Sequence, residues 1–352
     1  MLKNITLGGR EVGINCPPFI IAELSGNHNQ SLSKALMLVD EAAKAGADAI
    51  KLQTYTAATM TINSVGDEFF IRDEGNLWKG KTLYELYDRA HTPWEWHEAI
   101  FRKAESLGLV AFSSPFDLTA VDFLESLDVP CYKIASFEIV DTALIQRVAE
   151  TGKPVIMSTG MASLAEIEEA VKIATEAGCR QLILLKCTSS YPALAEDANV
   201  ATIPHMKELF TCHVGLSDHT VGIGVSIAAV VEGAAIVEKH LTLSRSNGGV
   251  DSAFSMEPSE FKLLVEESRR AWLAIGNVTY GPTDNELDSL KFRRSLYIVK
   301  DILAGETLTE ENLKSIRPGL GLSPKYYRQL IGRKVKANLK SGTAMNWSLI
   351  GD

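Results

Sequence analysis

The sequence lacks the features that mark membrane and exported proteins. No stretch reaches the roughly 18 uninterrupted apolar residues that a membrane-spanning helix needs. The first residues, Met1 to Thr6, contain no basic segment followed by an apolar core, which is the pattern of a secretory signal peptide. We therefore expect no membrane association and no export.

Cysteine and net positive charge are also scarce. The cysteines form an odd set without C-x-x-C spacing, which favours reduced thiols in the cytoplasm over disulfides or a zinc knuckle: Cys16, Cys131, Cys179, Cys187 and Cys212. The net charge of −9 argues against a nucleic-acid-binding footprint. The chain has 352 residues, 46% of them hydrophobic and 22% charged, which is the composition of a globular protein with a sizeable core.

Short apolar runs recur along the chain, and each ends in polar, chemically capable residues. Eight such runs are present: Phe19–Glu23, Ala49–Gln53, Leu109–Ser114, Cys131–Glu138, Pro154–Thr159, Leu182–Thr188, Val214–His219 and Ile236–His240. The gaps between them have room for a loop and a helix, and alternation of strands with helices implies parallel strands. The pattern predicts an α/β fold, a (β/α)8 TIM barrel, with the active site where the strands end.

Helix signals fall in the gaps between these strands. Residues 31–46 place apolar side chains at helical spacing between Ser31 and a terminating Gly46. Thr92 and Glu95, on either side of Pro93, predict a capped helix start. The gap after Gln53 is unusually long, and the aromatic-rich insertion Tyr55–His91 is either a lid over the catalytic face or a packed surface excursion.

The charge distribution predicts a second domain. From Asn285 onward, 12 lysines and arginines stand against 7 acidic residues, whereas the preceding body is strongly acidic. We expect a barrel domain over residues 1–278, a linker over 279–289 and a small domain over 290–352 that opens with a strand in Leu290–Lys300. So small a module is near the lower size limit for independent folding, so we expect it to dock on something.

Two histidines end the last two predicted strands. His219 and His240 would be neighbours in a closed barrel, where two imidazoles can meet at one divalent metal. Closure also brings strand one, with Glu23, beside strand eight, so Glu23 is a candidate base or ligand. In the alternative interpretation, one of the histidines only caps its strand.

Lysines and serines share the same predicted rim. The lysines are costly to bury without a partner, so anionic ligands are their natural partners: Lys51, Lys133, Lys186 and Lys239. The serines can donate hydrogen bonds to phosphate or carboxylate oxygens: Ser114, Ser136, Ser158, Ser189 and Ser217. Together they predict a small, multiply charged substrate, although one lysine could instead form a Schiff base.

Two acidic residues on predicted loops complete the candidate set. Glu138 follows Ser136 by two residues and is a candidate for orienting a hydroxyl or transferring a proton. Asp251, on the eighth strand's loop, is a candidate for binding substrate hydroxyls. Both also fit the simpler interpretation of solvated loop acids.

The order of the motifs resembles that of a known enzyme family. The motifs are Glu23-Leu-Ser-Gly-Asn-His-Asn29, Lys51-Leu-Gln53, Ser113-Ser-Pro-Phe-Asp117, Lys133-Ile-Ala-Ser-Phe-Glu138, Ser158-Thr-Gly-Met161, Cys187-Thr-Ser-Ser-Tyr-Pro192, Gly215-Leu-Ser-Asp-His-Thr220, Glu238-Lys-His240 and Arg317-Pro-Gly-Leu-Gly321. They resemble the bacterial sialic acid synthases, which condense phosphoenolpyruvate with an amino-sugar aldehyde. The tail resembles that family's small antifreeze-like (SAF) domain, of β-clip type.

Within that family, the chain is similar to the pseudaminic acid synthases. The cues are Leu24-Ser25-Gly26, His91-Thr-Pro-Trp-Glu-Trp96 and Asp251-Ser252, where N-acetylneuraminate synthases typically carry Asp-His. The resemblance implies a transferase that joins phosphoenolpyruvate to 2,4-diacetamido-2,4,6-trideoxy-L-altrose, giving pseudaminate and phosphate. The alternative within the family is an N-acetylneuraminate or legionaminate synthase with the same chemistry.

The resemblance also implies roles for single residues. It puts His219 and His240 on a divalent metal, most often Mn²⁺, with Mg²⁺ or Co²⁺ as alternatives. It puts phosphoenolpyruvate among Lys51, Ser114, Lys133, Ser136, Ser189 and Ser217, and the sugar among Gln53, Glu138, Tyr191 and Asp251, while Ser158 stays a substrate-binding candidate from its place on the rim. Arg317 would reach into a partner subunit's barrel, which implies a domain-swapped homodimer.

Two readings from other classes compete with a synthase. A metal-dependent hydrolase on the same fold is disfavoured because the first strand ends in Glu23 without a His-x-His pair. A sugar-binding or ice-binding protein is suggested by the tail alone. It would not need two histidines, Glu23 and several lysines at one barrel mouth.

Overall fold

The computed structural model describes residues 2–72 and 78–351. The chain divides into two compact units, Met1–Gly276 and Asn277–Asp352. The division falls directly after the long helix α10 (Pro258–Ile275) ends. Each unit has its own core and is described separately below.

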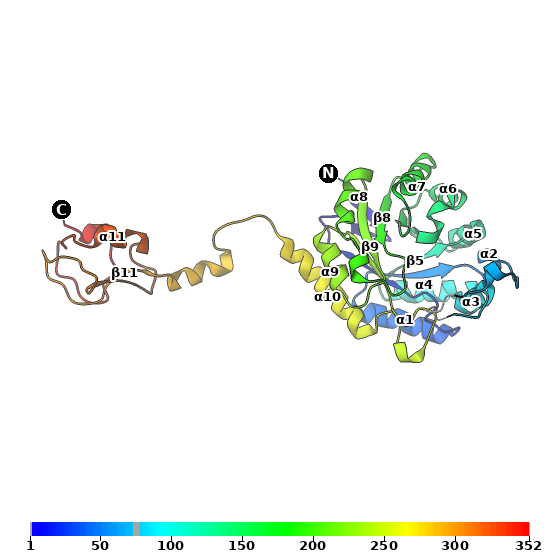
Figure 1. Cartoon of the computed structure of the whole chain (residues 1–352), viewed down its shortest axis with the longest axis horizontal. Coiled ribbons are helices and arrows are strands. Elements are labelled where there is room, and N and C mark those ends of the chain that lie inside the picture. The colour runs from blue at the N-terminus through cyan, green and yellow to red at the C-terminus, as the bar shows by residue number, and fades with distance from the viewer. Residues whose placement is uncertain (1, 73–77, 352) are drawn as a thin grey trace. The chain divides into compact units, whose positions relative to one another are not determined.

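The first unit is a closed barrel of eight parallel strands, which confirms the predicted fold (Figure 1). Around the barrel the strands follow the order β10-β3-β4-β5-β6-β7-β8-β9. Their bounds are β3 (Phe19–Glu23), β4 (Ala49–Thr54), β5 (Val110–Pro115), β6 (Tyr132–Ile134), β7 (Val155–Ser158), β8 (Leu182–Cys187), β9 (His213–Asp218) and β10 (Ile236–His240). Each predicted run overlaps one of these strands, and β10 closes the barrel on β3 by pairing His240 with Glu23.

Helices follow the strands and cover the outside of the barrel. With α10 they are α1 (Leu32–Ala45), α2 (Ala57–Met60), α3 (Leu83–Ala90), α4 (His97–Ser106), α5 (Leu118–Ser126), α6 (Thr142–Ala149), α7 (Leu164–Glu176), α8 (Thr202–Phe210) and α9 (Gly224–Val231). The predicted caps of α1 are confirmed, because the Ser31 side chain accepts a bond from the Lys34 amide and Gly46 adopts φ 84°. The cap predicted at Thr92 is wrong. That hydroxyl bonds His28, and a 3₁₀ turn over Trp94–Trp96 precedes α4.

The first unit packs its apolar side chains in two shells. The outward faces of the strands pack against the helices in one large cluster that includes Ile50 and Leu264. A second cluster fills the barrel interior, and an N-terminal hairpin of β1 (Ile5–Leu7) and β2 (Arg10–Val12) contributes Leu7 and Val12 to it. The barrel is therefore filled, and only its C-terminal mouth is left for a site.

The long insertion after β4 contains α2, a 3₁₀ turn over Asp67–Phe69 and α3. Its residues 73–77 lie outside the described part of the chain. Tyr55 at its start is buried in a small apolar cluster with Ala90 and Val250. The insertion thus packs against the loop that follows β10, on the same side of the barrel as the strand ends.

The second unit is small and mostly irregular, with one antiparallel pair, β11 (Ser295–Ile298) and β12 (Leu313–Ile316), and a short helix α11 (Tyr327–Leu330). The strand predicted over Leu290–Lys300 is too long, because Asp284–Phe292 form a 3₁₀ helix. The core of this unit is a separate apolar cluster that includes Leu308 and Leu330. No helix within residues 2–72 and 78–351 is long and apolar enough to cross a membrane.

Candidate active site

A cavity of about 730 Å³ lies at the C-terminal ends of the barrel strands. Most of the residues predicted from sequence line it: Lys51, Gln53, Lys133, Ser136, Glu138, Ser158, Ser189, Tyr191, Ser217, His219, His240 and Asp251. Strand ends and the loops after them supply these side chains from all around the barrel, as the fold requires. The structure thus brings together residues that are up to 200 positions apart in the sequence.

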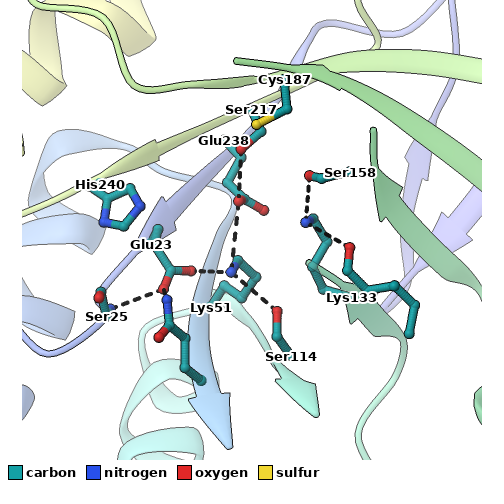
Figure 2. A network of polar contacts seen from close by, with 12 residues as sticks. Glu23, Ser25, Lys51, Ser114, Lys133, Ser158, Cys187, Ser217, Glu238 and His240 are labelled. Carbon is teal, nitrogen blue, oxygen red and sulfur yellow. Dashed lines mark hydrogen bonds and ion pairs between the residues drawn. The ribbon is translucent and has the colours of Figure 1, made fainter. Parts of the chain in front are cut away.

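Lys51 is a buried cation at the wall of the cavity. Its ammonium group forms an ion pair with Glu23, lies 3.7 Å from Glu238 Oε1 and donates to Ser114 Oγ over 3.3 Å (Figure 2). Burial acts to lower the pKa of Lys51, but the two carboxylates outweigh it and raise the pKa above its usual value. Lys51 therefore stays protonated, with Ser114 beneath it as a buried support.

Glu23 lies beneath the cavity surface. Its Oε1 accepts bonds from the Ser25 amide at 3.1 Å and from Gln53 Nε2 at 3.0 Å, and its other oxygen faces Lys51. Burial raises the pKa of Glu23, although Lys51 opposes this shift. Glu23 thus anchors three residues that line the cavity.

Glu238 is a site residue that sequence reasoning missed. Its carboxylate accepts a bond from Ser217 Oγ at 3.3 Å. Burial acts to raise the pKa of Glu238, but Lys133 and Lys51 lower it, so it remains ionised. The alternation of side chains along a strand is the signal that could have identified Glu238. Glu238 lies two residues before His240 and faces the same side, whereas Lys239 faces the other side.

Two of the four lysines proposed as anion ligands are elsewhere, so that prediction is wrong for them. Lys239 points to the outer side of β10 and pairs there with Asp218. Lys186 bonds the Cys187 carbonyl and the Thr188 hydroxyl. Parallel strands are apolar on both faces, so the run alone did not reveal which way each lysine points.

Lys133 is the second cation of the cavity. Its ammonium group donates to Ser158 Oγ at 2.6 Å and to the Ile134 carbonyl at 3.1 Å. Burial lowers the pKa of Lys133, while Glu238 opposes the shift. A doubly charged anion that binds here would therefore restore favourable surroundings for the charged lysine.

Gly160 allows two serine hydroxyls that line the cavity to approach the backbone closely. Its amide donates to Ser136 Oγ at 3.1 Å. A Cβ atom at Gly160 would lie 2.2 Å from Ser189 Oγ and 2.8 Å from Ser136 Oγ. The close approach of backbone and hydroxyls forms a set of donors suited to phosphate or carboxylate oxygens.

Glu138 sits on a 3₁₀ turn, Ser136–Val140, at the edge of the same cavity. Burial raises the pKa of Glu138 to about 7, although Lys133 opposes the shift. Its buried Oε2 finds no hydrogen-bond partner in the part of the chain that the structure describes. A carboxyl group with these properties can hold or release a proton near neutral pH.

His219 and His240 face each other, with ring centroids 5.3 Å apart. His219 Nδ1 is 3.0 Å from the Thr188 carbonyl, which it bonds as donor. His240 Nδ1 is buried and has no hydrogen-bond partner among the described residues. Burial, together with the neighbouring His219, holds the pKa of His240 well below its usual value, so the ring is neutral. A neutral imidazole with an orphaned nitrogen is the form that binds metal.

The donor set therefore fits a divalent cation that is held by two imidazoles and completes its coordination with substrate or water. Asp251 Oδ2 lies 3.9 Å from His240 Nδ1. No group of three or more metal-binding side chains is found within the described ranges. Among the described residues, the candidate metal ligands at this site are therefore the two histidine side chains.

Cys187 is a second residue that sequence reasoning passed over. Its Sγ lies 3.8 Å from His219 Nδ1, at the cavity wall. Burial acts to raise the pKa of this thiol, but His219 brings it down to about 7. Nothing in the spacing of the Cys187-Thr-Ser motif indicates that the thiol, rather than the serine hydroxyl, belongs to the site.

One wall of the cavity is apolar. Tyr55 contacts Phe116 and Tyr87 edge to face, with centroids 5.2 and 5.8 Å apart. Most of the wall comes from the insertion: Tyr55, Met60, Trp78, Leu86, Tyr87 and Ala90. The insertion is therefore part of the site, and its movement as a lid stays a prediction.

Arg317 is the one predicted site residue in the second unit. It lies at the end of β12 and precedes Pro318 through a cis peptide bond. Its predicted contact with the barrel of a partner chain stays a prediction.

Comparisons with known proteins agree with this arrangement. The NeuB family model matches residues 38–280, and the SAF domain model matches residues 293–350. The chain is 45% identical to the pseudaminic acid synthase of Helicobacter pylori over 94% of its length and 97% of that protein. It is 46% identical to the pseudaminic acid synthase of Campylobacter jejuni over 93% of its length and 95% of that protein.

Among solved structures, the chain is similar to the N-acetylneuraminic acid (sialic acid) synthetase of Leptospira borgpetersenii in complex with citrate. The TM-score is 0.72 and the identity 34%, over 83% of this chain and 96% of that one. This likeness agrees with the closed barrel and the cavity at its mouth.

Proposed function

The chain belongs to the NeuB family, and from this membership and the geometry of its cavity we propose that it condenses phosphoenolpyruvate with 2,4-diacetamido-2,4,6-trideoxy-L-altrose. Carbon 3 of phosphoenolpyruvate attacks the sugar aldehyde, water adds at carbon 2, and C–O cleavage releases phosphate. The products are pseudaminate, a nine-carbon 2-keto acid, and inorganic phosphate. The similarity to two pseudaminic acid synthases supports this choice of sugar.

The observation that carries the proposal is the convergence of two buried ammonium groups on one cavity. The side chains of Lys51 and Lys133 are almost fully buried, yet both line the cavity. Lys51 already pairs with Glu23 and Glu238, but Lys133 has no carboxylate within ion-pair distance in the described part of the chain. An anionic ligand such as phosphoenolpyruvate is therefore the natural partner of its buried charge. Ser136, Ser158 and Ser189 add hydroxyl donors on the Lys133 side. Their contribution is positioning and electrostatic stabilisation of charge on the phosphate and carboxylate.

We propose that His219 and His240 hold a divalent cation, most readily Mn²⁺, with Mg²⁺ and Co²⁺ as alternatives. When bound there, it would supply Lewis-acid polarisation of the sugar aldehyde oxygen. The chain's own contribution is to keep the His240 ring neutral and to hold the two rings close together, with centroids 5.3 Å apart.

Glu138 and Glu23 have different proposed roles because they lie at different depths. Glu138 reaches the cavity with a pKa of about 7, so it serves as the group that holds or moves a proton at the hydroxyl or phosphate. Glu23 is already bonded to Ser25, Gln53 and Lys51, so it orients these groups and directs the approach of water from beneath.

The sugar would occupy the opposite side of the cavity. Gln53, Tyr191 and Asp251 offer polar groups for its hydroxyls and amides. The apolar wall formed by Phe116 and the residues of the insertion, such as Tyr55, suits the 6-deoxy methyl group and the acetamido methyls.

We also propose that the enzyme works as a homodimer in the cytoplasm. Several large apolar side chains are exposed on the loops around the cavity mouth: Phe137, Val140, Met161, Leu164, Leu194 and Val221. Such a rim suits a docked SAF domain from a second chain, with Arg317 near the sugar. All five cysteines are free thiols, which suits a reducing compartment.

The test is phosphate release from phosphoenolpyruvate with Mn²⁺, comparing the altrose sugar, the legionaminate precursor and N-acetylmannosamine. Turnover with only the altrose sugar is the expected result. Turnover with another sugar would keep the condensation and replace the specificity by that of a legionaminate or N-acetylneuraminate synthase. No phosphate release with any sugar would contradict the proposed function.

A further inference from the structure

An ion pair outside the cavity connects the two strand ends that carry the histidines. Asp218 and Lys239 stand directly opposite each other in the register of β9 and β10. Each immediately precedes one of the histidines, His219 and His240. Because side chains alternate along a strand, the pair points to the outer side of the barrel while its neighbours line the cavity.

The pair is buried, and both of its partners make further hydrogen bonds. Lys239 Nζ lies 2.7 Å from Asp218 Oδ2, and both side chains are 1% exposed. The same ammonium group donates to the Thr220 carbonyl at 2.7 Å. Asp218 Oδ1 accepts the Thr220 amide and hydroxyl at 2.8 and 2.7 Å, and its Oδ2 accepts Ser226 Oγ at 2.5 Å. These bonds connect β9, β10, the loop after His219 and helix α9.

Stability alone is a weak reason for such a pair. Removing two charges from water costs about as much as their attraction returns, and well-packed apolar residues often serve equally well. Directional bonds do something that apolar packing does not, because they fix the position of one strand end relative to the other. His240 depends on this more than His219 does, because its Nδ1 has no hydrogen-bond partner within residues 2–72 and 78–351.

We propose that Asp218 and Lys239 are positioning residues that hold the rings of His219 and His240 at the spacing a shared divalent cation needs. The inference rests on the proposed function only in that it assumes a metal at these histidines. The pair acts from behind the site and touches neither substrate nor metal. Metal sites generally depend on such supporting contacts, whose loss lowers metal affinity about 10- to 100-fold.

The test is direct titration of the full chain with Mn²⁺, without substrate, following free Mn²⁺ by electron paramagnetic resonance. One variant is Asp218→Asn, which removes the charge but keeps the shape of the side chain. The other is the double variant Asp218→Leu with Lys239→Met, which replaces the pair with apolar residues. The matched control is Arg10→Met with Asp48→Asn, which breaks an ion pair at the opposite end of the barrel, where the two groups are 2.6 Å apart.

We expect both Asp218 variants to raise the dissociation constant for Mn²⁺ about 10-fold or more, and the control to leave it unchanged. Melting temperature, measured on the same metal-free samples, should not track the loss of affinity. The KM for phosphoenolpyruvate should stay near wild type, because Lys51 and Lys133 do not contact the pair.

Unchanged Mn²⁺ affinity in both Asp218 variants would overturn the inference. So would the absence of saturable Mn²⁺ binding to the wild-type chain or an equal loss of affinity in the control. The proposed condensation is judged separately, by phosphate release from phosphoenolpyruvate with the wild-type chain, an assay that does not involve the Asp218 variants. The two failures are therefore distinguishable.

Discussion

The ammonium group of Lys133 donates to the hydroxyl of Ser158 over 2.6 Å, at the wall of the cavity. This bond aims a buried positive charge at the place where we propose the phosphate or carboxylate of phosphoenolpyruvate. The ammonium group of Lys133 is therefore held in a fixed orientation, and its charge is available to bind an anionic ligand. Its contribution can be measured separately from that of the other lysines.

Lys133→Met should lower kcat/KM for phosphoenolpyruvate about 100- to 1,000-fold, because a preorganised charge in a water-excluded site is lost. Initial rates of phosphate release over a range of phosphoenolpyruvate concentrations give this value. Lys186→Met is the matched control, since Lys186 is partly buried on β8, two strands away from β6 in the barrel, and bonds the Cys187 carbonyl. A similar loss in both variants would mean that the effect is structural.

Lys51→Met should abolish activity and also destabilise the fold. It would leave Glu23 and Glu238 as buried carboxylates without their shared cation, at a cost of about 3–5 kcal/mol in the free energy of unfolding. The loss should shrink at lower pH, because protonation relieves the two carboxylates of their charge. Urea denaturation at pH 5.5 and pH 7.5 measures this, and a loss that does not vary with pH would contradict the electrostatic explanation.

Glu138→Gln should change how stability depends on pH. Burial raises the pKa of Glu138 to about 7 in the folded chain, from 4.5 when exposed. The folded state therefore keeps a proton that the unfolded state releases, and the wild type loses stability as pH rises from about 4.5 to about 7. The variant lacks this pH dependence. Its free energy of unfolding should therefore rise relative to that of the wild type by up to about 3 kcal/mol over that range.

Thermal or urea unfolding of both proteins across this pH range, without substrate, measures the gain. The control is Glu168→Gln on the exposed face of α7. The stability of this variant should depend on pH in the same way as that of the wild type. If the stability of Glu138→Gln depended on pH in the same way as that of the wild type, the raised pKa of Glu138 would be refuted. The proposed proton-transfer role predicts in addition that the limb near pH 7 disappears from the pH–rate profile of the variant.

Phe116→Ala should weaken the use of the sugar and spare phosphoenolpyruvate. The ring lines the cavity and packs edge to face against Tyr55. Losing apolar contact of this size costs about 1–3 kcal/mol, so the KM for the sugar should rise roughly 10- to 100-fold. Phe69→Ala is the control, because it makes the same substitution in the insertion after β4, at a residue that does not line the cavity. A larger change in the KM for phosphoenolpyruvate than for the sugar would exclude a sugar-facing role for this wall.

The barrel could be predicted from sequence because its strands are short apolar runs with polar ends. The residues at those ends, such as Lys51 and His240, had to lie near the cavity whatever their orientation. Side-chain direction was harder to predict. In Glu238-Lys239-His240 all three residues are chemically capable, and only the register of β10 in the closed barrel decides that Lys239 faces away. Strands buried on both faces carry no alternation that would reveal this.

Other features depended on contacts between distant parts of the chain. The hairpin β1–β2 closes the lower end of the barrel through a few apolar residues, too short a signal to separate from a loop. The Cys187 thiol gains its acidity mainly from His219, which is 32 residues away in sequence and adjacent in space. Sequence patterns of single segments do not contain such relationships.

Gly160→Ala should be among the most damaging single-methyl changes in the protein. The added Cβ would approach Ser189 Oγ to 2.2 Å and Ser136 Oγ to 2.8 Å, so at least one of the two hydroxyls must leave its place. Because both hydroxyls lie beside Lys133 in the proposed phosphoenolpyruvate site, KM for phosphoenolpyruvate should rise while KM for the sugar changes less. Gly224→Ala is the matched control, since a Cβ there meets nothing within 4 Å and the residue begins helix α9.

The control substitution should be neutral or slightly stabilising, because alanine favours helices over glycine by about 1 kcal/mol. Steady-state kinetics with each substrate varied in turn, beside melting temperatures of both variants, separates a damaged site from a damaged fold. A Gly160→Ala enzyme with unchanged KM for phosphoenolpyruvate would place that substrate elsewhere in the cavity. The serine hydroxyls would then have to be assigned to the sugar, and the lysines alone would be left to hold the anion.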